Sequence, residues 1–145
     1  MAAPIAAMRV IEGCSADALP LDELLREGQP ALLKGIARDW GLAKAGLRST
    51  EEAMSYLRGF DSGKPVQYSH GGPEIGGRPF YNQAFTELNF QVRRGGLGEV
   101  LEAISSHLDD ALPPTYYVAS LLVDGALPGF AQENDLGLAE LGIQA

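Results

Sequence analysis

The spacing of apolar residues predicts three helices. The first covers Leu21–Glu27 and ends at Gly28. The second opens on the capping-box pattern Ser49-Thr50-Glu51-Glu52 and runs to about Arg58. The third follows Gly95-Gly96, and Pro113-Pro114 forbid its continuation. The apolar residues that fall at helical spacing in the second and third helices are Ala53, Met54, Leu57, Leu97, Val100, Leu101, Ile104 and Leu108.

The longest apolar run, Thr115–Val123, predicts a strand covered on both faces, because breakers bound it at each end. Alternation along that strand sends Tyr116 and Tyr117 to opposite faces of one sheet. A phenol inside a sheet needs a hydrogen-bond partner, so at least one of these tyrosines needs a role. Shorter extended segments are predicted at Met8–Glu12, Ala31–Lys34, Pro65–Ser69 and Phe80-Tyr81. The mixture of elements predicts an α+β fold.

The segments between these elements have their own patterns. The glycine-rich stretch from His70 to Pro79 predicts turns or a mobile hairpin. Arg93-Arg94-Gly95-Gly96, before the third helix, could place two guanidiniums and free amides around an anion, but it lacks the Walker lysine and the Rossmann spacing. It is therefore interpreted as a solvated turn that caps the helix. Leu127–Asn134 is interpreted as a short helix or turn. Apolar anchors are expected at Phe85, Leu88 and Phe90, and a core or cover position for Trp40.

Composition narrows the class of protein. The 145 residues predict one domain or part of a larger one, and 46% hydrophobic content supports a core. A formal net charge of −8 argues against nucleic acid as a partner. Cys14 is the only cysteine, which fits a reducing compartment. The sequence shows neither a signal peptide nor an apolar run long enough to cross a membrane, so a soluble, cytoplasmic protein is expected.

Two patterns that resemble catalytic or metal sites favour ordinary roles. His107-Leu108-Asp109 matches the letters H-x-D of non-haem iron sites. In a helix, however, residues i and i+2 point about 200° apart, and the only other histidine, His70, lies upstream. A protonated His107 that complements a helix C-terminus is the favoured interpretation. Cys14 has no histidine near it in sequence and is interpreted as a spectator thiol. No metal site is expected in this chain.

Five stretches of the chain carry a resemblance to a known family when they are taken in order. They are PALLKGIARDW (Pro30–Trp40), FDSGKPV (Phe60–Val66), PEIGGRPFYN (Pro73–Asn82), LNFQVRRGGLGEVL (Leu88–Leu101) and PPTYYVASLLVDGALPGF (Pro113–Phe130). This series resembles the N-terminal part of the cupin-like JmjC family, the "cupin 8" type that is related to an asparaginyl hydroxylase. The resemblance begins at about Val10 and covers nearly all of the remaining chain. No single stretch is decisive, and the ordered series is what makes the resemblance specific.

The resemblance implies a double-stranded β-helix that binds Fe(II) and 2-oxoglutarate and hydroxylates proteins or small molecules. It places Tyr117 at the position of a tyrosine that holds the distal carboxylate of 2-oxoglutarate, with Tyr116 as the alternative if the register differs by one residue. The loop Gly71–Arg78 corresponds to one that flanks the active-site mouth, so Tyr81 and Asn82 become substrate-side candidates. The lysine that usually pairs with this carboxylate in the family has no counterpart in this chain. Ala119 occupies the position at which the related hydroxylase contacts its substrate with a side-chain amide, so substrate recognition is not implied for this chain.

The family's iron ligands would lie beyond Ala145, and neither His70 nor His107 replaces them. Residues 1–145 are therefore expected to be the N-terminal portion of a cupin-like domain, with helices and the first strands of the β-helix but without its metal-binding half. Alone, such a portion should bind neither Fe(II) nor 2-oxoglutarate tightly, so whether the chain is an enzyme stays open. The alternative is a stand-alone, non-catalytic assembly module. The expected partner is a second copy of the chain or the missing C-terminal half.

Overall fold

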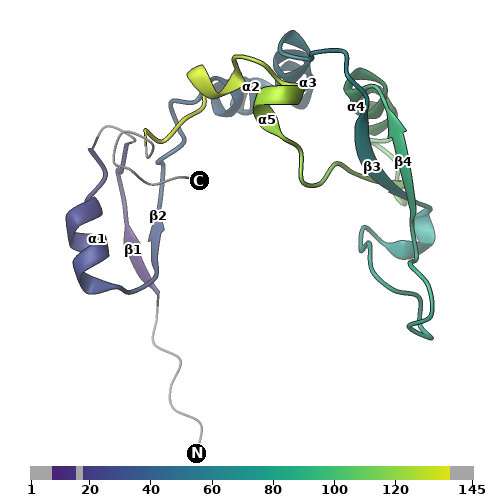
Figure 1. The fold of residues 1–145 in the computed structure, drawn as a ribbon, viewed down its shortest axis with the longest axis horizontal. Helices are drawn as coiled ribbons and strands as arrows, with labels where there is room; N and C mark the ends of the chain where they lie inside the picture. The colour runs from purple at the N-terminus through teal and green to yellow at the C-terminus, as the bar shows by residue number, and fades with distance from the viewer. Residues whose placement is uncertain (1–7, 16–17, 138–145) are drawn as a thin grey trace, which may run out of the picture.

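The computed structural model describes residues 8–15 and 18–137, which form two small sheets joined by helices into an arch (Figure 1). At one end, β1 (Arg9–Ile11) and β2 (Ala31–Leu33) pair in parallel, with α1 (Leu21–Glu27) as their crossover. At the other end, β3 (Val66–Gly71) lies between two antiparallel neighbours, β4 (Gln91–Gly95) and β5 (Thr115–Tyr117). The predicted mixture of helices and strands is confirmed.

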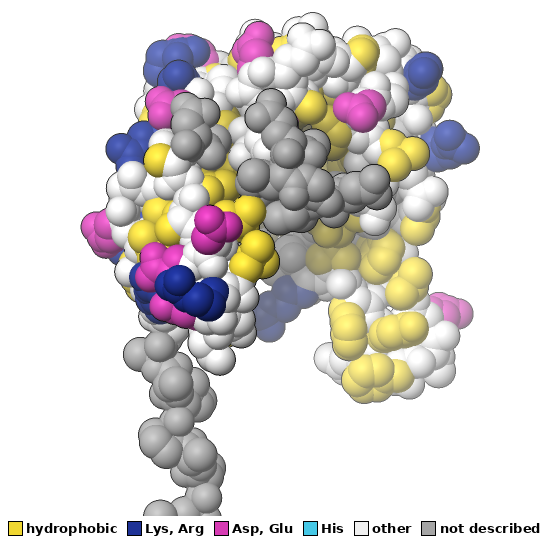
Figure 2. All heavy atoms as spheres, turned by 60° about the vertical axis from the view of Figure 1, so that its left-hand side comes forward, with side chains coloured by type: hydrophobic (Ala, Val, Ile, Leu, Met, Phe, Trp, Pro, Cys, Tyr) yellow, Lys and Arg dark blue, Asp and Glu magenta, His cyan; other side chains and the backbone are white. Residues whose placement is uncertain are grey.

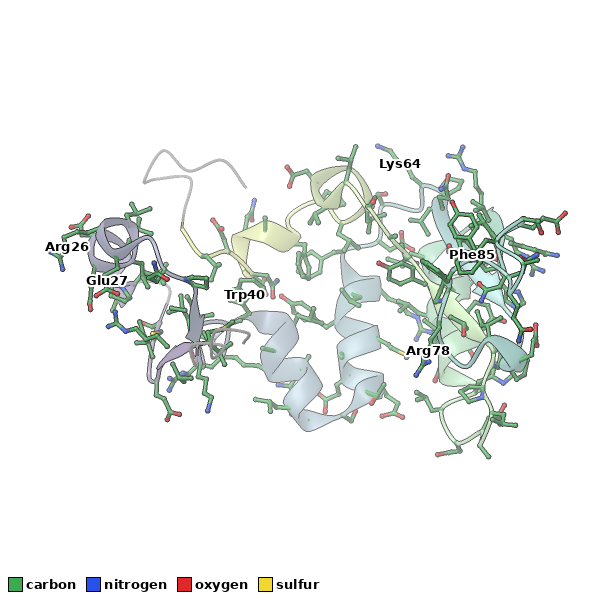
Figure 3. The ribbon with its side chains drawn as sticks, turned by 90° about the horizontal axis from the view of Figure 1, so that it is seen from below. Arg26, Glu27, Trp40, Lys64, Arg78 and Phe85 are labelled. Atoms are coloured by element: carbon green, nitrogen blue, oxygen red, sulfur yellow. The ribbon has the colours of Figure 1, made fainter. Side chains whose placement is uncertain are left out.

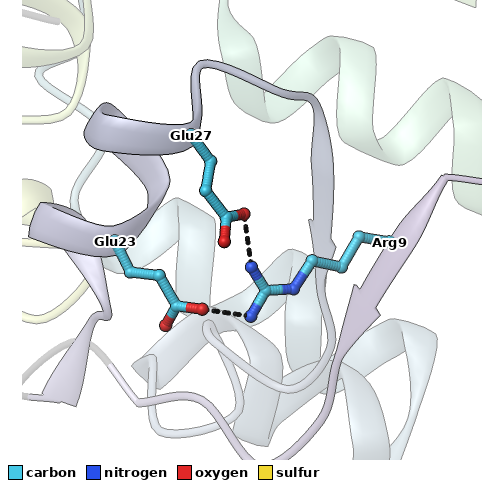
Figure 4. Close-up of polar contacts among 3 residues, drawn as sticks. All are labelled: Arg9, Glu23 and Glu27. Atoms are coloured by element: carbon cyan, nitrogen blue, oxygen red, sulfur yellow. Dashed lines mark hydrogen bonds and ion pairs between the residues drawn. The ribbon is translucent and has the colours of Figure 1, made fainter.

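Two ion pairs lie on the surface of the β1–α1–β2 unit. The guanidinium of Arg9 donates to Glu23 at 2.6 Å and to Glu27 at 2.5 Å, which ties β1 to α1 (Figure 4). Helix α1 ends at Gly28 as predicted, because that glycine adopts the left-handed conformation that closes a helix. Arg26 and Glu27 mark this end of the arch in Figure 3.

Two helices, α2 (Gly41–Arg48) and α3 (Thr50–Gly59), form a helical hairpin in the middle of the arch. Helix α2 was not predicted, because its two glycines weaken the helical signal of a short segment. The Ser49 side chain accepts from the amide of Glu52 at 3.1 Å, as the capping box predicted. In a capping box the Glu52 side chain would also accept from the backbone amide of Ser49. Here the Glu52 carboxylate binds the guanidinium of Arg48 instead.

The hydrophobic core lies between α3, β3 and α4 (Leu97–Ser105), and α5 (Val123–Ala126) covers it. Its buried side chains are Met54, Val66, Leu97, Leu101, Ala126 and Leu127. The third predicted helix is confirmed, but α4 ends at Ser105 and leaves Leu108 in a turn with 46% of its surface exposed. Short 3₁₀ turns at η2 (Pro73–Ile75) and η3 (Phe130–Gln132) complete the elements.

Asn134 joins three elements as the only buried polar residue in the described part of the chain. Its side chain accepts from the amide of Leu42 at 2.9 Å and donates to the hydroxyl of Tyr56 at 3.0 Å. Tyr56 in turn donates to Glu133 at 2.7 Å. Burial and the hydrogen bond to Glu133 raise the pKa of Tyr56. The half-buried Trp40 adds a bond from its indole Nε1 to the carbonyl of Asp135 at 3.0 Å.

The prediction of one long strand over Thr115–Val123 is wrong. Only Thr115–Tyr117 pair with β3, and the chain then leaves the sheet. Ser120 has a positive φ of 53°, which turns the backbone, and Val123 begins α5. The apolar residues of this run do not form a strand covered on both faces. Val118 and Leu121 pack on the core, and Leu122 stays 85% exposed.

Two further predictions fail in the segment before α4. Arg93 and Arg94 lie on strand β4 rather than in a capping turn, and the Gly96 amide is satisfied by Glu99 at 3.0 Å. Of the expected apolar anchors, Phe85 is 70% exposed and Leu88 48% exposed, so neither anchors the loop in the core. Residues 138–145, the end of an apolar stretch in the sequence, lie outside the described residues. Within the described part of the chain, no helix is long and apolar enough to cross a membrane.

Candidate functional site

The three-stranded sheet has one covered and one open face. Residues paired directly across antiparallel strands point to the same face. Val66 packs on Leu97 and Leu101, so its face of the sheet lies against α4. The opposite face carries Gln67, Ser69, Val92, Arg94 and Tyr117, by their pairing across the strands.

Tyr117 lies on this open face and is 55% exposed. It pairs with Ser69 of β3, which pairs in turn with Val92 of β4. Its phenol makes no side-chain hydrogen bond to another residue in the part of the chain that the structure describes. The hydroxyl is therefore available to donate to a bound group.

A hollow of about 360 Å³ lies between the Val66 end of the sheet and the segment 119–126, and Tyr117 is not part of its wall. Its wall includes Arg94, Lys64, Gln67 and Ala119. Figure 3 shows Lys64 extending outward from the segment that precedes β3. Neither Arg94 nor Lys64 forms an ion pair with a described residue. Arg94 on the face of Tyr117, with Lys64 at the wall of the hollow, gives this side of the sheet a positive charge that favours an anion.

Tyr116 points to the opposite face, toward α4. Its ring contacts His70 edge-on at 4.8 Å between centroids and lies nearly parallel to His107 at 6.5 Å. Tyr116 and His107 line the largest described cavity, of about 530 Å³, which we call the α4–β5 pocket. Its wall is mainly apolar, with Pro73, Gly76, Gly77, Ile104, Leu108, Ala111, Leu112, Pro113, Pro114 and Thr115 as the other lining residues. The two tyrosines therefore serve different surfaces.

The side chains that could bind a metal do not lie together in the described part of the chain. Among residues 8–15 and 18–137, no three side chains of His, Cys, Asp or Glu are grouped to hold an ion. His107 forms its contact with Asp110, at 2.7 Å from Nδ1, and not with Asp109 of the H-x-D letters. The expected interaction of His107 with a helix C-terminus stays a prediction. The described side chains do not fit an iron site.

The substrate-side candidates Tyr81 and Asn82 lie in the loop between η2 and β4, away from both cavities. Tyr81 is 49% exposed and contacts the rings of Phe80 and Phe85. Asn82 has a structural role, because its side chain accepts from the Thr86 amide at 3.1 Å and donates to the Thr86 hydroxyl at 3.0 Å. Cys14 is buried, in keeping with a spectator thiol.

Sequence reasoning missed Lys64, and it set aside Arg94 as part of an anion site before the third helix. Arg94 had been assigned to a turn, and only the register of β4 against β3 places it on the face of Tyr117. The signal that could have revealed it is the alternation in Gln91–Gly95, which is weak because polar residues occupy both faces of an exposed edge strand.

Comparison with known proteins agrees with the mixed fold and the ordered motifs. No curated protein and no solved structure matches the chain. A family model for a cupin-like domain matches residues 16–145, which is most of the sequence. The chain therefore belongs to the family of cupin-like domains.

Proposed function

We propose that this chain provides the co-substrate side of an Fe(II)/2-oxoglutarate-dependent oxygenase of the JmjC type, and that it is not catalytic by itself. The observation that carries the proposal is the exposed phenol of Tyr117 on the open sheet face, which Arg94 shares. Membership of the cupin-like family supports an oxygenase ancestry. The metal-binding half is proposed to come from residues beyond those described or from a second chain.

In this proposal the open face holds one carboxylate of the co-substrate. The Tyr117 hydroxyl donates a hydrogen bond to a carboxylate oxygen, and Arg94 supplies the positive charge that a lysine supplies in the family. Iron, when bound by the complete domain, would supply oxygen activation. The described side chains of this chain orient the co-substrate and do not hold the metal.

A cytoplasmic location is part of the same proposal. A single, buried, unpaired thiol is compatible with a reducing compartment. Fe(II) is also retained more readily in such a compartment than in an oxidising one.

The test is a titration of the whole chain with 2-oxoglutarate, followed by NMR. We expect weak binding, with a Kd of about 1 mM or above, because one carboxylate subsite on an open face contributes only a few contacts. Tyr117→Phe and Arg94→Gln should each raise that Kd by roughly 3- to 10-fold, since each removes one charge-assisted contact. Tyr116→Phe is the matched control, because its ring lies on the other face.

Three outcomes would overturn the proposal. One is the absence of any saturable shift, and another is a Kd that depends on Tyr116 and not on Tyr117. The third concerns the metal: tight Fe(II) binding at one stoichiometric site, lost in His107→Ala, would contradict the expectation that this chain binds no iron alone.

The second candidate function is a stand-alone, non-catalytic assembly module. The observation that favours it is the set of large apolar side chains that the described residues leave exposed, among them Leu47 at 83%, Leu112 at 73% and Leu122 at 85%. Exposed apolar side chains of this kind are often covered by a partner. An assembly module would show no response to 2-oxoglutarate and would form a specific complex, whereas the oxygenase proposal requires the response to 2-oxoglutarate.

A further inference from the structure

Three aromatic rings, Phe80, Tyr81 and Phe85, cluster at the tip of the loop that projects from the end of the three-stranded sheet; we call them the aromatic tip. Their ring centroids lie 5.4 to 6.4 Å apart in edge-to-face and tilted pairs. The rings remain 59%, 49% and 70% exposed, respectively. Figure 2 shows hydrophobic side chains gathered on a protruding lobe at lower right. Contiguous exposed apolar groups of this kind mark interaction surfaces.

The loop holds the rings outward in a fixed conformation. The side chain of Asn89 accepts from the Phe80 amide at 2.7 Å and donates to the Arg78 carbonyl at 3.0 Å. At the other end of the loop, Asn82 bonds Thr86. Phe85 itself has a positive φ of 56°, a conformation that is strained for a bulky residue. Strain that the surroundings enforce is typical of functional positions.

The α4–β5 pocket is a fitting receptor for such a tip. It is apolar, has a volume of about 530 Å³, and is lined by prolines and leucines together with the Tyr116 ring. It belongs to the same lobe, because Pro73, Gly76 and Gly77 of its wall precede the aromatic tip in the same loop. A projection and a hollow at one end of a molecule permit a two-fold arrangement in which each copy supplies both.

Charge beside the two surfaces is complementary. Arg78 precedes the aromatic tip and is exposed in the same lobe as Phe85 (Figure 3). Asp109 is exposed between Leu108 and Ala111 of the pocket wall. Neither forms an ion pair with another described residue. An Arg78–Asp109 pair between copies would offset part of the repulsion that a net charge of −8 imposes on association.

We propose that the chain forms a two-fold dimer in which the aromatic tip of each copy inserts into the α4–β5 pocket of the other. Aromatic side chains bury about 150–250 Å² each, so covering the exposed parts of the three rings removes on the order of 350 Å² per tip. Two tips remove on the order of 700 Å² of ring surface, and with the pocket walls the interface stays below about 1,200 Å², at the small end of specific contacts. The proposal does not depend on the co-substrate contact, because it uses the other end and face of the sheet.

The experiment measures the mass of the whole chain by sedimentation velocity over a concentration series. We expect a species of twice 15.4 kDa with a Kd in the low micromolar range. Phe85→Gly should raise that Kd by at least about 30-fold, as the loss of a central aromatic anchor does. Glycine tolerates a positive φ, so this variant removes the ring without straining the loop. Leu47→Ala, on the 83% exposed Leu47 of α2, should leave the Kd unchanged.

Two further variants test the receptor. Ala111→Trp fills the α4–β5 pocket and should abolish the dimer while the circular dichroism spectrum stays that of the native chain. Arg78→Glu should weaken the dimer, and adding Asp109→Lys to it should restore the wild-type Kd. Rescue of this kind requires the two side chains to face each other in the complex.

The proposal is refuted by a wild-type chain that sediments only at 15.4 kDa, or by a dimer that survives both Phe85→Gly and Ala111→Trp. Binding of a monomer to phosphatidylcholine vesicles, lost in Phe85→Gly, would also overturn it and assign the tip to a lipid surface. None of these results alters the titration with 2-oxoglutarate, so the two proposals fail separately.

Discussion

Two glycines of helix α2 should respond to the same substitution with opposite signs. A Cβ added at Gly41 would overlap the hydroxyl of Tyr56 and come within 2.9 Å of a Glu133 carboxylate oxygen. A Cβ at Gly46 meets only the methyl group of Ala53, at 3.9 Å, an ordinary van der Waals contact. The two positions therefore share a helix and differ in the space around them.

The expected magnitudes follow from these contacts. Gly46→Ala should stabilise the chain by up to about 1 kcal/mol, the difference in helix propensity between the two residues. Gly41→Ala should destabilise it by about 1–3 kcal/mol, as overpacking does. Tyr56 cannot easily move aside, because its ring packs on Phe60 at 5.1 Å and on Phe130 at 6.3 Å.

Urea denaturation followed by far-ultraviolet circular dichroism measures both changes in the free energy of unfolding. A double variant adds a sharper control: Tyr56→Phe removes the hydroxyl that the new methyl group would meet and keeps the ring carbon at 2.5 Å, so it relieves part of the overlap. The loss in Gly41→Ala/Tyr56→Phe should then be smaller than the sum of the single losses. The reasoning is refuted if Gly41→Ala and Gly46→Ala stabilise the chain equally, or if the double variant is simply additive.

The remaining predictions concern the polar junction and the core. Asn134→Ala should lower the free energy of unfolding by about 1–3 kcal/mol in urea denaturation, because it leaves the Leu42 amide and other buried groups without partners. The raised pKa of Tyr56 predicts a stability that is fully present below pH 10, the ordinary value for tyrosine, and is lost as pH rises through the folded-state pKa. Tyr56→Phe should abolish that part of the alkaline loss in thermal unfolding at several pH values; an unchanged profile would contradict it. Leu101→Ala should cost about 2–5 kcal/mol, because this side chain is 7% exposed at the centre of the core.

The sequence predicted elements whose signal is local. The cap at Ser49, the glycine stop at Gly28 and the helical spacing after Gly96 depend on neighbours within a few residues, and all three are confirmed. The extent of β5 depends instead on a partner strand. Although β3 continues to Val66 beyond the partner of Tyr117, the chain leaves the sheet there, because Ser120 turns the backbone and Val118 and Leu121 pack on the core.

The candidate site was predictable in part for the same reason. Alternation alone separates Tyr116 from Tyr117, and the structure places them on opposite faces. The packing of α4 decides which face of the sheet stays open. The register of the edge strand β4 decides that Arg94 lies on that face. Neither is encoded in a short stretch of sequence. The clash at Gly41 is hidden likewise, since it involves Tyr56 and Glu133 from distant segments.

The position of Trp40 gives the protein a natural optical reporter. It is the sole tryptophan of the sequence, and its indole donates to the carbonyl of Asp135, a residue 95 positions later. Release of that late segment would expose the indole to water, shifting its fluorescence to longer wavelength and opening it to collisional quenchers. Emission excited selectively at the indole therefore follows the joint between the helical hairpin and the late segment, without a label and without interference from the five tyrosines.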